Sequence, residues 1–152
     1  MLTNTFANQI LQLLLAGQPI PGFAAPASAG NLTQLWVGMH TSDPGAGGTQ
    51  ETAECNYTGY TRIAVSRNSL AWTFAAGGAS ASPVARIEFP EVRGGNQQLA
   101  THLSFGTSRT GAGLLLLRGE LDPVVTCLRG VTPGVKNTAT IRFLTDKITD
   151  KA

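Results

Sequence analysis

The amino-acid sequence predicts a mainly β protein: an antiparallel β-sandwich or jelly-roll-like domain with one short N-terminal helix. Two observations lead to this prediction. From Leu32 onward, short alternating or apolar segments recur at spacings of roughly 8–15 residues with turn residues between them, a pattern typical of antiparallel sandwiches. Ahead of them, residues 4–16 show the apolar spacing of a helix.

The helix is the first element in the chain. Its apolar face, at the spacing i, i+4, i+7 and i+8, contains Phe6, Ile10, Leu13 and Leu14, and Leu11 and Leu15 widen it. Gly17 suits the position after a helix, and Pro19 and Pro21 prevent its continuation. Because a helix of this length is marginal alone, its apolar face must be buried against something.

The strands follow. Glycine, proline and asparagine turns separate the segments that we expect to be extended, which are residues 35–40, 60–65, 70–74, 85–89, 99–105, 114–121, 124–128 and 138–144. This organisation predicts three parts: a helix with an apolar arm or linker over residues 1–30, a β-sandwich domain over 31–145, and a polar C-terminal tail over 146–152.

Charge is scarce and uneven. Charged residues make up 13% of the chain, against about 25% in a typical soluble domain, and the first of them is Asp43. This scarcity indicates that much of the surface faces other protein. The uncharged N-terminal part then has two interpretations: a helix that packs on its own domain, or an arm that docks on a neighbouring subunit. The docking residues of such an arm would be Phe6, Ile10, Leu13, Leu14 and Phe23.

The same composition argues against two classes of partner. The net charge is +2 and the basic residues are spread thinly, whereas binding to phosphate backbones needs clustered positive charge. We therefore expect no nucleic-acid partner. No apolar run approaches the ~20 residues that span a bilayer, and no basic residues precede the short apolar stretch as in a signal peptide. We expect a soluble protein that is made without export.

Cys55 and Cys127 are the only cysteines. Two thiols without further ligands do not form a structural zinc site. In a bacterial cytosol two reduced, buried thiols are the default, and a disulfide within or between subunits is the alternative.

Residues for catalysis are few. His40 and His102 fall in expected strands without adjacent Asp, Glu or Cys partners, which favours ordinary packing over metal binding or catalysis. Glu88 and Glu91 flank Pro90 and point in no defined common direction, so they are a weak glycosidase pair. The sequence predicts no enzyme, and no catalytic, cofactor-binding or metal site.

The aromatic residues suggest an alternative. A β-sandwich with exposed tyrosines could stack on sugars, as in a carbohydrate-binding module, and Tyr57 and Tyr60 beside a glycine are the candidates for such a surface or receptor contact. Trp36 and Trp72 lie in apolar segments, which favours the core for both.

Several segments are informative together. In chain order they are Leu35-Trp-Val-Gly-Met-His-Thr-Ser-Asp-Pro-Gly, Tyr57-Thr-Gly-Tyr-Thr-Arg-Ile-Ala-Val, Ile87-Glu-Phe-Pro, Thr101-His-Leu-Ser-Phe-Gly and Gly113-Leu-Leu-Leu-Leu-Arg-Gly-Glu-Leu. With the N-terminal helix ahead of them, they resemble a family of short tailed-bacteriophage virion proteins often labelled phage tail fibre proteins. The resemblance covers about residues 3 to 144, and it implies a non-enzymatic β-sandwich component of the phage particle.

The chain does not have the sequence of a rod. It has no heptad repeat, collagen-like triplet or β-helix period. We therefore hypothesise a capsid decoration (cement) protein in the virion, assembled in the bacterial host cytoplasm, with the major capsid protein or other virion proteins as partners and a homo-oligomeric state. The alternative is a compact tail or head fibre or collar subunit, with or without carbohydrate receptor binding.

Overall fold

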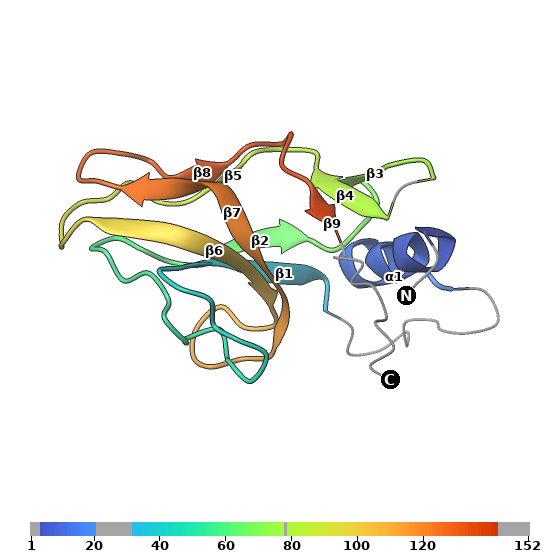
Figure 1. The fold of residues 1–152 in the computed structure, drawn as a ribbon, viewed down its shortest axis with the longest axis horizontal. Helices are drawn as coiled ribbons and strands as arrows, with labels where there is room; N and C mark the ends of the chain where they lie inside the picture. Colours follow the sequence, from blue (N-terminus) through green and yellow to red (C-terminus); the bar gives the residue numbers. More distant parts are fainter. Residues whose placement is uncertain (1–3, 21–31, 78, 143–152) are drawn as a thin grey trace, which may run out of the picture. The chain divides into compact units, whose positions relative to one another are not determined.

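The computed structural model describes residues 4–20, 32–77 and 79–142. Its strands are antiparallel and one helix stands near the N-terminus (Figure 1), so the mainly β class is confirmed. The chain forms two compact units. We call Leu32–Ser66 with Arg86–Lys136 the sheet unit, and Met1–Asn31 with Arg67–Ala85 and Asn137–Ala152 the helix unit.

The sheet unit is built on a four-stranded antiparallel sheet with the order β2-β1-β6-β7. Its strands are β1 (Gln34–His40), β2 (Ile63–Ser66), β6 (Gln98–Gly106) and β7 (Leu115–Cys127). The central strand β1 places Val37 opposite Ile63 on one side and opposite Phe105 on the other. Side chains alternate between the two faces of a strand, so this row of apolar residues lies on one face of the sheet.

A two-stranded ribbon forms the second layer of the sheet unit. It comprises β5 (Ile87–Glu88) and β8 (Gly134–Val135), and backbone hydrogen bonds from Phe89 to Pro133 and from Val92 to Val131 extend it. We call residues 87–92 and 130–135 the ribbon. Four of its apolar side chains are buried, Ile87, Phe89, Val92 and Val135, whereas Val131 is 40% exposed. Since β5 contacts β2, the ribbon covers one face of the sheet (Figure 1).

The helix unit packs α1 (Asn4–Ala16) against a three-stranded sheet of order β3-β4-β9. The strands are β3 (Trp72–Phe74), β4 (Ser80–Pro83) and β9 (Ile141–Arg142). The helix contacts β3 and β4 through a face that includes Ala7, Leu11 and Leu15, each at most 1% exposed. Among the residues that the structure describes, the helix therefore buries its face within its own unit.

The end of the helix forms as the sequence predicts. Gly17 has φ +66° and its amide donates to Leu13 O at 3.1 Å, a geometry that glycine adopts without strain. Arg67 then donates to the last carbonyls, from Nε to Leu14 O at 2.7 Å and from Nη2 to Leu13 O at 2.6 Å. This cation supplies the positive charge that the last turn of the helix itself lacks.

Several strand boundaries differ from the prediction. Residues 114–121 and 124–128 form one long strand, β7, because both halves pair with β6 across an irregular register. The expected strand at 85–89 is shorter, and β4 at Ser80–Pro83 was not predicted. The division into residues 1–30, 31–145 and 146–152 also differs from the observed units, because residues 67–85 group with the helix. The tail at 146–152 lies outside the described residues.

Candidate functional site

An ion pair occupies the centre of a polar cluster on the sheet unit. Glu54 lies in the connection between β1 and β2, where its backbone forms an isolated antiparallel β-bridge with that of His40. Arg62 immediately precedes β2. The guanidinium donates to both carboxylate oxygens, each at 2.7 Å. The Arg62 side chain is 3% exposed and that of Glu54 is 16% exposed. A buried pair of this kind needs further hydrogen bonds to offset the loss of hydration.

Arg62 makes those further hydrogen bonds to the connection between β6 and β7. Its Nη1 donates to Ser108 O and to Gly111 O, both at 2.9 Å. Glu54 in turn accepts a 2.9 Å hydrogen bond from the hydroxyl of Tyr60. Burial is the main cause of a raised pKa at Tyr60, with the Glu54 charge adding to it, so the phenol stays a donor at neutral pH.

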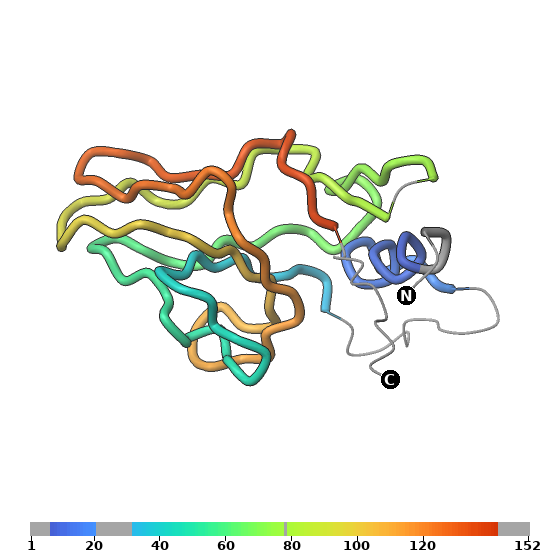
Figure 2. Tube along the Cα trace, in the orientation of Figure 1, coloured from blue at the N-terminus to red at the C-terminus, as the bar shows by residue number. Residues whose placement is uncertain are grey.

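Gln50 joins the same two connections. Its backbone N–H donates to Ala112 O at 2.8 Å, and its side-chain Oε1 accepts from Ser108 N at 2.9 Å. The side chain is fully buried against Gly106, where a Cβ would lie only 2.1 Å from Gln50 Cδ. Figure 2 shows the two connections side by side, and we call residues 41–54 and 107–114 the loop platform.

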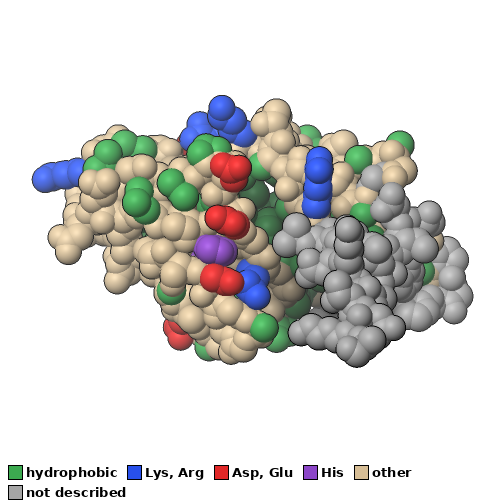
Figure 3. Space-filling model, in the orientation of Figure 1, with side chains coloured by type: hydrophobic (Ala, Val, Ile, Leu, Met, Phe, Trp, Pro, Cys, Tyr) green, Lys and Arg blue, Asp and Glu red, His purple; other side chains and the backbone are tan. Residues whose placement is uncertain are grey.

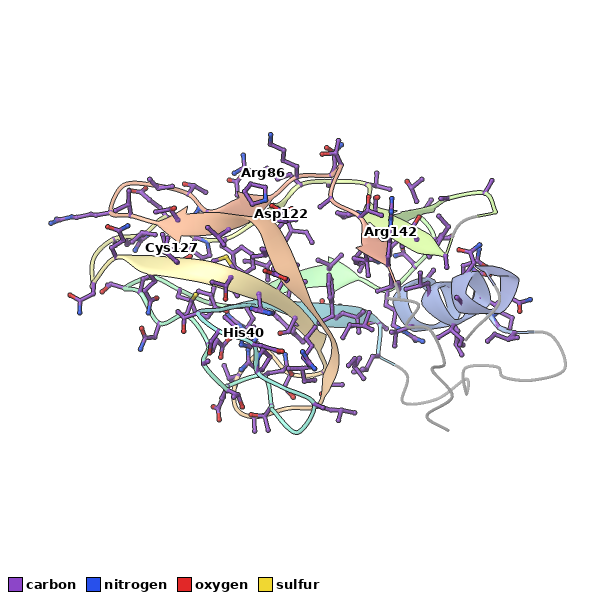
Figure 4. All side chains as sticks on the ribbon, viewed as in Figure 1. His40, Arg86, Asp122, Cys127 and Arg142 are labelled. Atoms are coloured by element: carbon purple, nitrogen blue, oxygen red, sulfur yellow. The ribbon has the colours of Figure 1, made fainter. Side chains whose placement is uncertain are left out.

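A histidine lies at the end of β1, where the chain enters the loop platform (Figure 4). His40 Nδ1 is 2.8 Å from Thr52 O, and Nε2 is 2.7 Å from Ser104 Oγ. Because a carbonyl oxygen only accepts, Nδ1 carries the proton, and in the neutral ring Nε2 accepts from the serine hydroxyl. Burial, the largest cause, lowers the pKa of His40, which favours this neutral form.

The order hydroxyl, imidazole, carbonyl resembles part of a hydrolase triad. However, His40 and Ser104 are both 0% exposed, and a nucleophile must reach its substrate. In this closed position, the arrangement fixes the connection from 41 to 54 on the sheet and has no access to a substrate. The expectation that His40 serves ordinary packing agrees with this geometry.

The outer surface of the sheet unit carries its exposed charges. Figure 3 shows acidic side chains in a row around one histidine. Arg118 binds Asp43 at 2.5 Å, and His102 lies opposite Glu120 in the β6–β7 register. Within the described residues, no group of three or more His, Cys, Asp or Glu side chains is placed to hold a metal ion. In that same part of the chain, no helix is long and apolar enough to cross a membrane.

Tyr57 and Tyr60 are placed inward. Tyr57 is 3% exposed, and its hydroxyl donates to Pro90 O at 2.9 Å. Its ring meets that of Tyr60 edge-on at 5.3 Å, and Tyr60 stacks on Phe89 at 6.1 Å. These rings fill the space between the sheet and the ribbon, so this arrangement gives no support to a sugar-stacking role. Of the tryptophans, Trp72 is buried, whereas Trp36 is half-buried with Arg109 over its ring at 5.9 Å.

The apolar residues assigned to the arm are only partly covered. Ile10, Leu13 and Leu14 are half-buried, while the side chain of Phe6 and the whole of Phe23 lie outside the described residues. The residues that the helix buries most are instead one position along, at Ala7, Leu11 and Leu15. We call Ile10, Leu13 and Leu14 the helix stripe, because together they leave apolar surface beside the buried face.

The two cysteines lie together. Cys55 and Cys127 are both buried as free thiols, and the two thiols lie close enough to shift each other's pKa. No spacing in the sequence reveals this contact. Likewise, nothing local marks Gln50, Glu54 and Arg62 as a cluster, because each has its partners on another connection.

Comparison with known protein families identifies a match over most of the chain. A family model described as Podophage GP4 fiber I protein gp80 matches residues 1–143. No curated protein matches the sequence. The match spans the helix unit and the sheet unit alike, and it agrees with the resemblance to phage virion proteins noted from the sequence.

Proposed function

The chain belongs to the family described as Podophage GP4 fiber I protein gp80, and from that premise we propose that it is a structural subunit of a fibre on a podophage particle. The family match over residues 1–143 carries this proposal. Family members are structural fibre proteins, a class that is generally non-enzymatic. The buried position of the Ser104 and His40 pair is consistent with such a role.

A fibre made of this chain must be built by association. The sequence has none of the repeats that let one chain form a long rod, and the chain folds as two compact units. Two surfaces are suited to contacts between virion subunits. One is the helix stripe, and the other is the loop platform, whose backbone is held by Arg62 and Gln50.

Capsid decoration is the second candidate. The observation that favours it is the absence of any charged residue before Asp43, since a neutral apolar segment is suited to permanent burial against a lattice of capsid subunits. In both candidates the partners are virion proteins, and further copies of this chain would give a homo-oligomer. The inward placement of Tyr57 removes the observation on which sugar binding depended.

Cryo-electron microscopy of the particle that contains this chain separates the candidates. Density at the tail or the collar would support the fibre proposal. Density repeated over the icosahedral shell would overturn it in favour of decoration. Density in neither place would contradict both.

The helix stripe is tested separately. Leu13→Glu places a charge on half-buried apolar surface without touching Leu11 or Leu15, so the helix unit is expected to remain folded. We expect incorporation into particles to fall at least tenfold, because a charge buried in an interface must lose its hydration. Gln9→Glu is the matched control, with the same new charge at a polar, half-buried position of the same helix. Equal incorporation of both variants would exclude the stripe as a contact.

Deleting the first 30 residues would be a poorer test. Since α1 contacts β3 and β4, deletion would uncover the sheet of the helix unit. A loss of incorporation would then have two explanations, misfolding and a lost contact.

A further inference from the structure

Two buried thiols from distant parts of the chain meet in the sheet unit. Cys55 lies in the connection between β1 and β2 and is 2% exposed, while Cys127 ends β7 and is 0% exposed. The amide of Cys55 donates to Met39 O at 2.8 Å, which aligns it beside β1. Cys127 lies opposite Gln98 in the β6–β7 register.

The neighbours of both cysteines are clamped to each other. Asn56 N donates to Gln98 Oε1 at 2.9 Å, and Gln98 Nε2 donates to Asn56 Oδ1 at 2.7 Å. Asn56 follows Cys55 in the chain, and Gln98 is the strand partner of Cys127. The clamp therefore holds the two cysteine backbones together independently of the thiols.

A metal ion does not explain the pair, because within the described residues the two thiols have no third ligand-type neighbour placed to complete a site. We propose that Cys55 and Cys127 are a redox pair that closes to an intramolecular disulfide when the protein meets a small-molecule disulfide as oxidant. Closure joins the connection from β1 to β2 covalently to the end of β7.

The reaction proceeds by two thiol–disulfide exchanges. The Cys127 thiolate attacks one sulfur of the oxidant, which releases one small thiolate and leaves a mixed disulfide on Cys127. The Cys55 thiol then loses its proton and attacks the Cys127 sulfur, which releases the second small thiolate. Two protein thiols are oxidised and one small-molecule disulfide is reduced to two thiols.

The two thiols differ in acidity, and this difference sets the order. The neighbouring Cys55 thiol lowers the pKa of Cys127, whereas the Cys127 thiol together with burial raises the pKa of Cys55. Cys127 is therefore the better first nucleophile. Since both thiols are buried, the oxidant reaches them only when the sheet unit opens locally, so oxidation is slow in native conditions and faster in a urea concentration below the unfolding transition.

The test uses the full-length, fully reduced protein incubated with oxidised glutathione and then acid-quenched and alkylated. We expect the intact mass to fall by about 2 Da through loss of two hydrogens, a peptide map that links Cys55 to Cys127, and a chain that remains monomeric on a non-reducing gel. We also expect Tm to rise by roughly 10 °C.

The Cys55→Ala variant provides the kinetic arm. It lacks the resolving thiol, so it is expected to accumulate a glutathione adduct on Cys127 that the wild-type protein does not retain. The wild-type result does not depend on the folding of this variant. Two free thiols in the wild-type protein after prolonged incubation in oxidised glutathione with sub-denaturing urea would overturn the proposal. A disulfide that links two chains would also overturn it.

Discussion

The two faces of the four-stranded sheet are stabilised in different ways. One face carries Leu35, Val37 and Met39, each at most 1% exposed, and packs under the ribbon. The other carries Gly38, His40 and Ser104 beneath the loop platform, where the nearest partners are polar. Strand β1 supplies the apolar set and, by alternation, Gly38 and His40 of the polar set, while Ser104 belongs to β6.

The difference concerns what each face specifies. Burial on the apolar face is non-directional and roughly proportional to area, so it stabilises the unit while tolerating changes of similar volume. The polar face depends on directed bonds between groups that are costly to leave unpaired. Those bonds determine the conformation of the loop platform, which is one of the two surfaces proposed to contact other virion proteins.

One fluorescence measurement can compare the two faces, because it reports on the sheet unit without a signal from the helix unit. The chain has two tryptophans, with Trp36 in the sheet unit and Trp72 in the helix unit. Urea unfolding followed by Trp36 fluorescence, in a Trp72→Phe background, therefore reports on the unit that contains both faces.

The largest expected effect is on the apolar face. Phe89 is 1% exposed and stacks on Tyr60, so Phe89→Ala should lower the free energy of unfolding by about 4 kcal/mol through lost burial and the cavity left behind. Leu114→Ala is the control, since Leu114 is 62% exposed, and should change it by less than about 0.5 kcal/mol. Equal losses in the two variants would mean that the ribbon does not cover the sheet as described.

The polar face should be nearly as sensitive to a single substitution. Arg62→Met leaves Glu54 Oε2 and the carbonyls of Ser108 and Gly111 without the guanidinium donor, and should cost about 3 kcal/mol. Arg86→Met is the matched control, because the Arg86–Glu88 pair is about half exposed at 3.9 Å, and should cost less than about 1 kcal/mol. A loss at Arg62 no larger than at Arg86 would show that the ion pair is not buried.

The polar face has no room for a side chain at Gly106. Gly106→Ala introduces a Cβ at 2.1 Å from the buried Gln50 side chain, and we expect a loss of about 2 kcal/mol. Adding Gln50→Ala removes the clash, so the double variant should lose less than the sum of the two single losses. Additive losses would indicate that Gln50 does not lie over Gly106.

The sequence predicts the parts of this fold that depend on local pattern. Helix α1 covers the residues expected of it, because apolar spacing and the glycine after it are local signals. The strand containing Val37 was recognised for the same reason. The fusion of 114–121 with 124–128 could not be predicted, because pairing with β6 decides it.

The candidate site could not be predicted at all. Glu54 and Arg62 are ordinary polar residues in a connection, and only the fold brings the Ser108 carbonyl to the guanidinium. The tyrosines show the opposite case. Their position beside Gly59 suggested exposure, yet long-range contacts with Pro90 and Phe89 enclose the rings.

A pH titration tests the neutral histidine on the polar face. The pKa of His40 lies below its ordinary value of 6.5 because of burial, so as the pH falls the unfolded chain binds the proton first. The contribution of neutral His40 to the free energy of unfolding should be fully present above about pH 6.5. Below that pH it should decrease, by at most about 1.4 kcal/mol per pH unit for one proton. His40→Gln should lose this component and His102→Gln should keep it. An unchanged slope in His40→Gln would assign the dependence to another group.

The smallest effect tests whether the loop platform is strained. Ala53 has φ +52°, a left-handed conformation that costs an alanine about 1–2 kcal/mol, and its carbonyl accepts from the amide of Thr41 at 2.8 Å. Ala53→Gly removes that strain but adds about 0.5–1 kcal/mol of chain entropy to be lost on folding. The net expectation is a gain of about 0.5 kcal/mol, opposite in sign to Gly106→Ala on the same face. A loss of stability in Ala53→Gly would mean that Ala53 does not adopt this conformation in solution, and that the bonds of the polar face hold the platform less firmly than its geometry implies.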